Sequence, residues 1–196
     1  MPDRDSLPRG ATRERLLRAA IELIAEAGWG GVTTRSVAER AGVNQALVHY
    51  HYRSVPGLLR EAAYAAMAAT FEPAMSRLAE AQDPVAGLRA VVTALLEIDP
   101  QAPESLVVAE ATVQAVRDAE LGSQVRQMLT VFREVLAERL GAARDSGRLS
   151  PAIQPAGLAT ALAGLLDGLA LHRMIDPSVN VGSAAEAIQA LLEEGS

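Results

Sequence analysis

Four residues in the segment from Gln45 to Tyr50 carry side chains that can read the edges of DNA base pairs. A Gln side chain can form two hydrogen bonds with adenine, and an Ala side chain can touch the thymine methyl group. Their spacing allows one helical face to present Gln45, Ala46, His49 and Tyr50 together. The pattern therefore predicts a short helix whose exposed face lies in the major groove of DNA.

Polar and basic residues flank this segment and are candidates for contacts with the DNA backbone. Such contacts position a protein on the duplex without specifying its sequence. The full set of predicted DNA-binding residues is Thr34, Arg35, Asn44, Gln45, Ala46, Val48, His49, Tyr50, His51 and Arg53.

Three residues provide the framework that would hold such a helix in place. Ala38 is small enough for two helices to cross closely, and Gly42 can adopt the left-handed turn between them. Val48 would attach the second helix to the first. A small residue, a turn glycine and a buried valine at these spacings are typical of a helix-turn-helix. The alternative is an ordinary helical hairpin inside a larger bundle.

The charge distribution favours a polyanion partner at the N-terminal end. The chain has a net charge of -6, which by itself argues against nucleic acid. However, residues 1–60 carry nine Arg against six acidic residues, whereas residues 61–196 carry nine Arg against eighteen. A basic N-terminal part joined to an acidic remainder is consistent with DNA binding by the first part alone.

The composition excludes several classes of function. The absence of Cys excludes disulfides, zinc–thiolate sites and thiol catalysis. The three His residues and the acidic residues form no recognisable metal-binding spacing, and no motif of an enzyme or a nucleotide cofactor occurs. We therefore predict a non-enzymatic protein with no cofactor and no metal. The polar N-terminus and the short, Asp167-interrupted apolar stretch at 156–171 predict a cytoplasmic protein without a membrane span.

Helical periodicity runs through the whole chain and no alternating strand pattern is found. The predicted fold is all-α, with an N-terminal three-helix helix-turn-helix domain and a C-terminal helical domain for ligand binding and dimerisation. The predicted boundaries are a flexible arm at 1–10, a DNA-binding domain at 11–54 and the second domain at 55–196. Thr12 is the predicted cap of the first helix, and Pro73 is a candidate break in the fourth.

The segment from Thr12 to Leu59 resembles the DNA-binding domain of the TetR (tetracycline-repressor) family. The resemblance rests on the string from Thr33 to Tyr52, TTRSVAERAGVNQALVHYHY, and a weaker likeness covers Leu165 to Leu171. Members of that family usually carry Tyr at the position of His49 and Lys at the position of Val55, and both often meet phosphate. The resemblance implies a DNA-binding regulator with a C-terminal domain for a ligand and for dimerisation.

Two apolar stripes in the C-terminal part favour a homodimer built from a four-helix bundle. The first stripe follows the helix around Val125 to Leu140, and the second follows the helix around Leu158 to Leu169. Gly164 and Gly168 would let a neighbouring helix approach closely. The alternative is that both stripes form the core of one chain. The predicted dimer interface consists of Leu129, Leu136, Leu158, Leu162, Leu165, Gly168 and Leu169.

A ligand site inside the helical domain would be mostly apolar with a few polar anchors. The candidate apolar residues, each of which could equally be core, are Met67, Phe71, Met75, Leu95, Val108, Met128 and Phe132. The candidate anchors are Glu110, Gln114, Asp167 and His172. The expected ligand is a small apolar or amphipathic molecule of unknown identity.

The sequence favours a dimeric repressor that binds a palindromic double-stranded operator and is released by this ligand. Two alternatives remain. One is a helical small-molecule-binding protein or enzyme that keeps the hairpin only for structure. The other is a DNA-binding activator, since the sign of regulation depends on where the operator lies.

Overall fold

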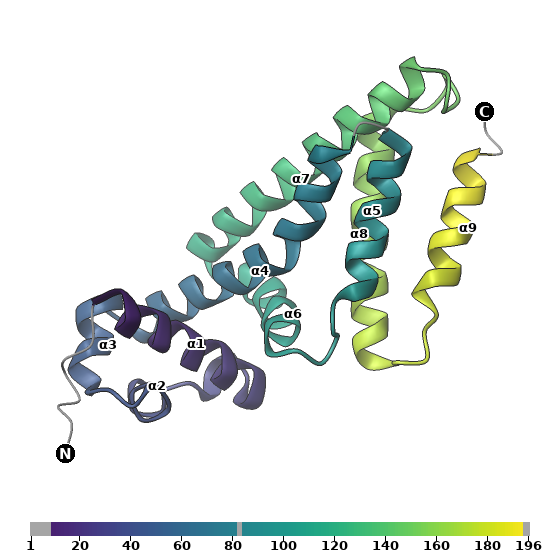
Figure 1. Cartoon of the computed structure of the whole chain (residues 1–196). Helices are drawn as coiled ribbons and strands as arrows, with labels where there is room; N and C mark the ends of the chain where they lie inside the picture. The colour runs from purple at the N-terminus through teal and green to yellow at the C-terminus, as the bar shows by residue number, and fades with distance from the viewer. Residues whose placement is uncertain (1–8, 82–83, 194–196) are drawn as a thin grey trace. The chain divides into compact units, whose positions relative to one another are not determined.

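The computed structural model describes residues 9–81 and 84–193, and within them the chain is helical with no β-strand (Figure 1). The predicted all-α class is confirmed. The first elements are α1 (Arg9–Ala27), the 3-10 turn η1 (Trp29–Gly31), α2 (Thr34–Ala41), α3 (Gln45–Tyr52) and α4 (Val55–Glu80). They are followed by α5 (Pro84–Glu97), α6 (Pro103–Ala115), α7 (Ala119–Asp145), α8 (Pro155–Ile175) and α9 (Val181–Glu193).

Two helix boundaries differ from the sequence-based prediction. Thr12 does not cap α1, because the helix begins at Arg9 and Thr12 is buried inside it. Two residues of the predicted arm are therefore helical, and residues 1–8 lie outside the described part. Pro73 does not break α4, which continues to Glu80. Proline removes one backbone hydrogen bond of a helix. Burial of Ala74 and Leu78 just beyond Pro73 offsets that loss.

The chain divides into two compact units, and the division does not follow the chain order. Unit 1 comprises residues 1–69 and 101–125, and unit 2 comprises residues 70–100 and 126–196. Helices α4 and α7 each contribute residues to both units. The functional boundary between residues 54 and 55 remains a prediction, because this division describes compactness and not function.

Unit 1 contains the helix-turn-helix and a helix that comes much later in the chain. α1 packs against α2 and also against α6, which follows it by more than seventy residues. The core of this unit is formed by buried side chains of α1 to α4, α6 and α7. They include Leu16, Ala20, Ile24, Val37, Val48, Leu58, Val107, Ala111 and Leu121. α6 thus supplies buried apolar surface to the unit that carries the predicted DNA-binding helix.

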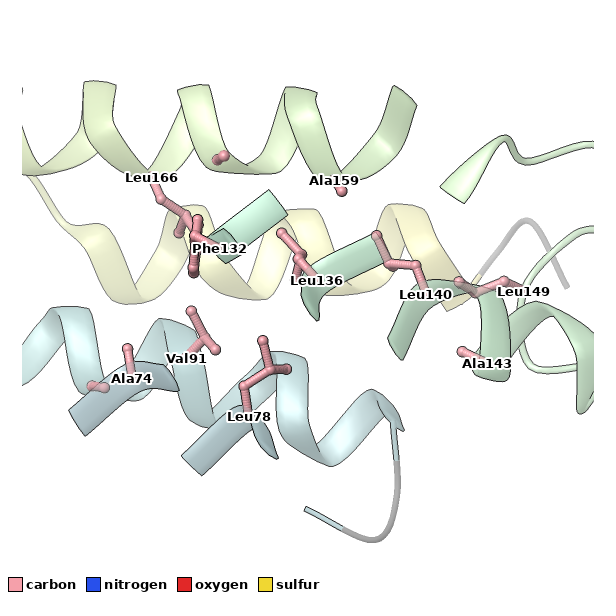
Figure 2. Close-up of a cluster of buried hydrophobic side chains, with 12 residues drawn as sticks. Ala74, Leu78, Val91, Phe132, Leu136, Leu140, Ala143, Leu149, Ala159 and Leu166 are labelled. Atoms are coloured by element: carbon pink, nitrogen blue, oxygen red, sulfur yellow. The ribbon is translucent and has the colours of Figure 1, made fainter. Parts of the chain in front are cut away.

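Unit 2 has its own hydrophobic core, formed by side chains from α4, α5, α7 and α8 (Figure 2). Its larger members are Leu78, Val91, Phe132, Leu136, Leu140, Leu149 and Leu166. Small residues on α8, such as Ala159 and Ala163, complete the cluster. Arg139 of α7 donates to the carbonyl groups of Ala79 and Ala81, which satisfies acceptors left open at the end of α4.

Candidate DNA-binding site

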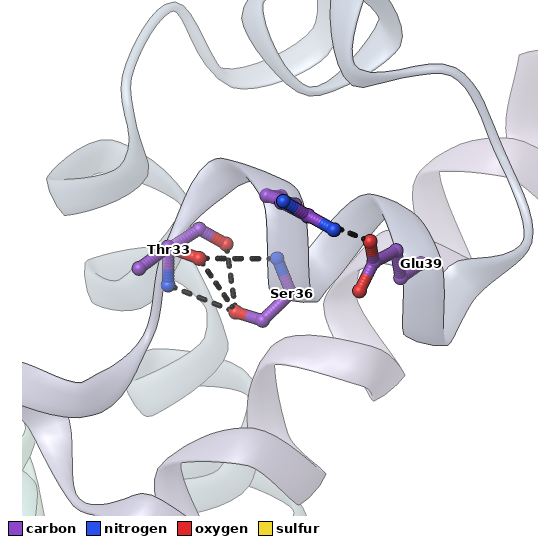
Figure 3. A network of polar contacts seen from close by, with 4 residues as sticks. Thr33, Ser36 and Glu39 are labelled. Carbon is purple, nitrogen blue, oxygen red and sulfur yellow. Dashed lines mark hydrogen bonds and ion pairs between the residues drawn. The ribbon is translucent and has the colours of Figure 1, made fainter.

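The start of α2 and the turn into α3 are determined by local hydrogen bonds. Thr33 and Ser36 form a reciprocal capping box at the start of α2 (Figure 3). Gly42 ends α2 in the left-handed conformation, with φ 65° and ψ 37°. Asn44 then caps α3 by accepting a hydrogen bond from the backbone N–H of Ala46 at 2.9 Å. These contacts satisfy donors at the helix starts and fix where α3 begins.

We expect Gly42→Ala to lower the free energy of unfolding by about 1–2 kcal/mol. The left-handed conformation is costly for any residue with a Cβ, and a Cβ at this position would lie 2.8 Å from Nη2 of Arg15. Thermal unfolding followed by circular dichroism measures the loss. Gly10→Ala is the matched control, since Gly10 lies in α1 with open space around it. Equal stability of Gly42→Ala and the wild-type chain would contradict this expectation.

The face of α3 predicted to read bases is exposed. Gln45, Ala46 and His49 are all exposed, and Tyr50 keeps 58% of its surface accessible. The Tyr50 ring meets the His51 ring edge to face at 5.1 Å between centroids. The opposite face of α3 is buried through Val48 and Tyr52. Unit 1 therefore holds α3 by one side and leaves the side with hydrogen-bonding groups open.

Val48 has to be removed from the predicted DNA-binding set. Its side chain is completely buried, so it serves the core of unit 1 and cannot reach DNA. The framework function predicted for Val48 agrees with this burial, as do the buried positions of Val37 and Ala38. Val43, beside the turn, is only partly buried.

The remaining candidates for phosphate contact lie at the ends of α2 and α3. Thr34 is half-buried and Arg35 is exposed in the first turn of α2. His51 is half-buried, whereas Arg53 is exposed and has a positive φ of 61° just beyond α3. Nδ1 of His49 lies 3.3 Å from the carbonyl oxygen of Arg53. α4 begins at Val55, where the TetR resemblance leads one to expect Lys.

Arginine side chains of α1 brace the helix-turn-helix, a function that sequence inspection missed. Arg15 donates to the carbonyl of Ala41, at the end of α2. Arg13 pairs with Glu61, and its guanidinium lies 5.7 Å from the centre of the Tyr52 ring. The Tyr52 hydroxyl in turn donates to the Arg13 carbonyl at 2.9 Å. Basic residues in this segment therefore also stabilise the fold, and their number overstates the charge offered to DNA.

A second group of charges joins α4 to the turn between α6 and α7. Arg60 pairs with Asp118 and with Glu120, each at 2.9 Å. Asp118 also accepts hydrogen bonds from the backbone N–H groups of Leu121 and Glu120 at the start of α7. The Leu121 backbone bond and the Arg60 guanidinium hold the pKa of Asp118 below its ordinary value. These residues lie too far apart in sequence for pattern reasoning to connect them.

The predicted ligand-binding residues do not form one group. Phe71, Met75 and Phe132 come together in unit 2, where the two Phe rings lie 6.2 Å apart. Met67 is buried in unit 1, and Glu110 lies in unit 1 beside Gly28. Of the others, Gln114 and Val108 belong to α6, Met128 is half-buried on α7, and the Leu95 side chain lies outside the described part.

The two polar candidates on α8 are exposed. Asp167 needs no internal partner there, although nearby protein atoms desolvate its carboxyl and raise its pKa. His172 is exposed one turn later. No group of three or more His, Asp or Glu residues able to hold a metal occurs within residues 9–81 and 84–193.

The predicted dimer-interface residues are divided between core and surface. Leu136 is only 1% exposed within its own chain, so the prediction that it forms the interface is wrong. Leu158 and Leu162 are partly buried and pack on the core cluster of unit 2. Leu129, Gly168 and Leu169 are half-buried, whereas Leu165 is exposed.

α8 has a buried face and an exposed apolar face on opposite sides. Ala159, Ala163 and Leu166 pack into unit 2. The opposite side is exposed or half-buried and presents Gly157, Ala161, Gly164, Leu165, Gly168, Leu171 and Ile175. Leu171 and Ile175 are not among the predicted interface residues, although they continue the same helical spacing. By length and composition alone α8 could also cross a membrane, and one such helix is weak evidence for a span.

Comparison with family models places both ends of the chain in one family. Residues 16–62 match bacterial regulatory proteins of the tetR family. Residues 84–195, more than half of the chain, match the C-terminal part of BetI-type transcriptional repressors. The two matches include the helix-turn-helix and most of the helices that follow it.

Individual proteins agree with these matches. The chain is 28% identical over 178 residues to the HTH-type transcriptional regulator BetI of Agrobacterium fabrum, covering 90% of this chain and 84% of that protein. A putative transcriptional regulator from Pseudomonas aeruginosa has the same fold with a TM-score of 0.83 at 20% identity, covering 99% of this chain and 94% of that one.

A putative regulator from Saccharomonospora viridis, solved in complex with choline, has a TM-score of 0.81 at 21% identity, covering 94% of this chain and 96% of that one. These relatives are transcription regulators and not enzymes, as the sequence predicted. The chain belongs to the TetR family of transcriptional regulators, with a C-terminal part of the BetI type, and is a DNA-binding regulator of transcription.

Proposed function

We propose that this regulator is a cytoplasmic, homodimeric repressor that leaves its palindromic operator when a small molecule binds unit 2. The DNA-binding part of this proposal rests on one observation, which is that α3 packs on the core of unit 1 through one face and exposes the other. Gln45, Ala46, His49 and Tyr50 are the proposed base-reading residues. Thr34, Arg35, Asn44, His51 and Arg53 are the proposed backbone contacts.

The exposed face of α8 supports the dimer. A helix that is apolar on both sides is stable in water only when both sides are covered. Its own unit covers one side, and we propose that a second copy of the chain covers the other. A Cβ built on Gly164 or Gly168 would meet nothing within 4 Å in the same chain, so these glycines leave room for a partner helix. Leu165, Leu171 and Ile175 would flank that close crossing.

We expect Gly168→Leu to weaken dimerisation by at least about 30-fold, since a Cβ there has open space within the subunit but the larger side chain blocks the partner helix. Sedimentation velocity over a range of protein concentrations measures the dissociation constant, and circular dichroism confirms the fold. Ala46→Leu is the control, because it adds the same side chain at an exposed position of α3. An unchanged dissociation constant for Gly168→Leu would exclude this face from the interface.

The ligand is proposed to bind among apolar side chains of unit 2, where Phe71, Met75 and Phe132 meet. α4 offers a route for its effect, because this one helix begins at Val55 beside α3 and ends in the core of unit 2. A shift of α4 would change the separation of the two recognition helices, which must match half-sites about 34–36 Å apart. A ligand preference of about 3 kcal/mol for the shifted state is sufficient for release.

A further inference from the structure

Four arginine side chains of the DNA-binding unit are engaged inside the unit. Ion pairs or carbonyl contacts that join two different elements engage Arg13, Arg15, Arg40 and Arg60. Arg40, for example, bonds to Glu26 at 2.6 Å and to Glu22 at 3.1 Å, and so ties α2 to α1. The positive charge available to DNA therefore depends on the guanidinium groups that do not brace the fold.

The pair between Arg35 and Glu39 is of a different kind. Nε of Arg35 donates to Oε1 of Glu39 at 2.8 Å, and both residues belong to α2 (Figure 3). Their side chains are 77% and 63% exposed, so the pair is surrounded by solvent and joins no two elements. The capping box of Thr33 and Ser36 already fixes the start of this helix. An exposed pair at this spacing contributes little to stability.

Arg35 lies in the first turn of α2, at the end of a helix that points backbone N–H groups outward. Helix N-termini favour anions, and a guanidinium group binds phosphate through two parallel hydrogen bonds. The guanidinium of Arg35 must separate from the Glu39 carboxylate before it can bind a phosphate. If the pair stays together, the Glu39 carboxylate is brought toward the phosphates, which repel it.

We propose that Glu39 sets the DNA affinity of this regulator by competing with phosphate for Arg35. This inference rests on the proposed contact of Arg35 with the DNA backbone. Because backbone contacts carry no sequence information, Glu39 lowers the affinity for the operator and for unrelated DNA by the same factor. It therefore limits how tightly the protein binds DNA without changing which sequence it selects.

Glu39→Gln removes the competing charge and keeps the length and helix propensity of the side chain. We expect about 3-fold tighter binding per recognition unit, and about 10-fold for a dimer, to operator and random duplexes alike. The slope of log K against log salt becomes steeper by about 1 per subunit. Fluorescence anisotropy with labelled duplexes at several salt concentrations measures both quantities.

Two controls separate the local pair from net charge. Glu72→Gln makes the same change in net charge at an exposed residue of unit 2 and is expected to leave DNA binding unchanged. Arg35→Gln weakens binding, and adding Glu39→Gln to it then gives a smaller gain than Glu39→Gln gives in the wild-type chain. The inference is overturned if Glu39→Gln binds like the wild-type chain, or if its gain is undiminished without Arg35. If the wild-type chain binds no DNA, the proposed function itself fails, and this inference fails with it.

Discussion

The double variant Gln45→Ala, Tyr50→Ala is expected to lose specific DNA binding by at least about 1,000-fold while remaining folded. A side chain that reads a base contributes about 1–3 kcal/mol of discrimination, and a symmetric dimer uses each residue twice. Neither change touches the core, since Gln45 and Tyr50 both lie on the exposed side of α3. The residual affinity should equal that for random DNA, because the backbone contacts remain.

Anisotropy with a labelled duplex from the region upstream of the chain's own coding sequence measures this loss. Tyr64→Ala is the matched control, because Tyr64 is an exposed tyrosine of the same unit that lies on α4. It should bind DNA like the wild-type chain. If the double variant retained full specificity, α3 would not be the helix that reads the bases.

The largest expected effect on stability is that of Leu136→Ala, which should lower the free energy of unfolding by about 3 kcal/mol. Truncation of a buried Leu to Ala costs about 2–5 kcal/mol, because apolar contacts are lost and a cavity remains. Leu136 lies at the centre of the unit 2 cluster between Phe132 and Leu140 (Figure 2). Its neighbours come from several helices, so the site cannot collapse easily around the smaller side chain.

Urea denaturation followed by circular dichroism at one fixed protein concentration measures this change. Val116→Ala is the comparison, since Val116 is 86% exposed and its truncation should alter stability by less than about 0.5 kcal/mol. A loss below 1 kcal/mol for Leu136→Ala would mean that this residue is not in the core. It would then return to the set of possible interface residues.

The residues that define the helix-turn-helix are close together in the sequence, and the backbone conformation or packing at each position restricts which residue type fits. The sequence therefore predicted this motif well. Gly42 adopts the left-handed turn, and Asn44 caps the helix that it was expected to start. Predictions failed where packing overrides local preference. Pro73 stays inside α4 because buried residues hold the helix on both sides of it.

The parts of the site that depend on distant contacts could not be predicted from spacing alone. An apolar stripe in the sequence does not indicate whether the same chain or a second copy covers it. The sequence therefore predicts Leu136 at a dimer interface, whereas it lies in the core of unit 2. The packing of α6 on α1 and the pairing of Arg60 with Asp118 join segments separated by more than fifty residues. Charge counts overstate the charge offered to DNA for the same reason, since four arginines of unit 1 are engaged by partners on other elements of that unit.

Binding of the unmodified chain to its own upstream DNA is the most direct test of a sequence-specific regulator. Anisotropy should be measured with that duplex and with a scrambled duplex of equal composition, at several salt concentrations. We predict a Kd of about 10⁻⁸ M or tighter for the upstream duplex, at least about 1,000-fold tighter than for the scrambled one. Both affinities should fall as salt rises. Equal affinity for the two duplexes, or no binding to either, would contradict the central claim.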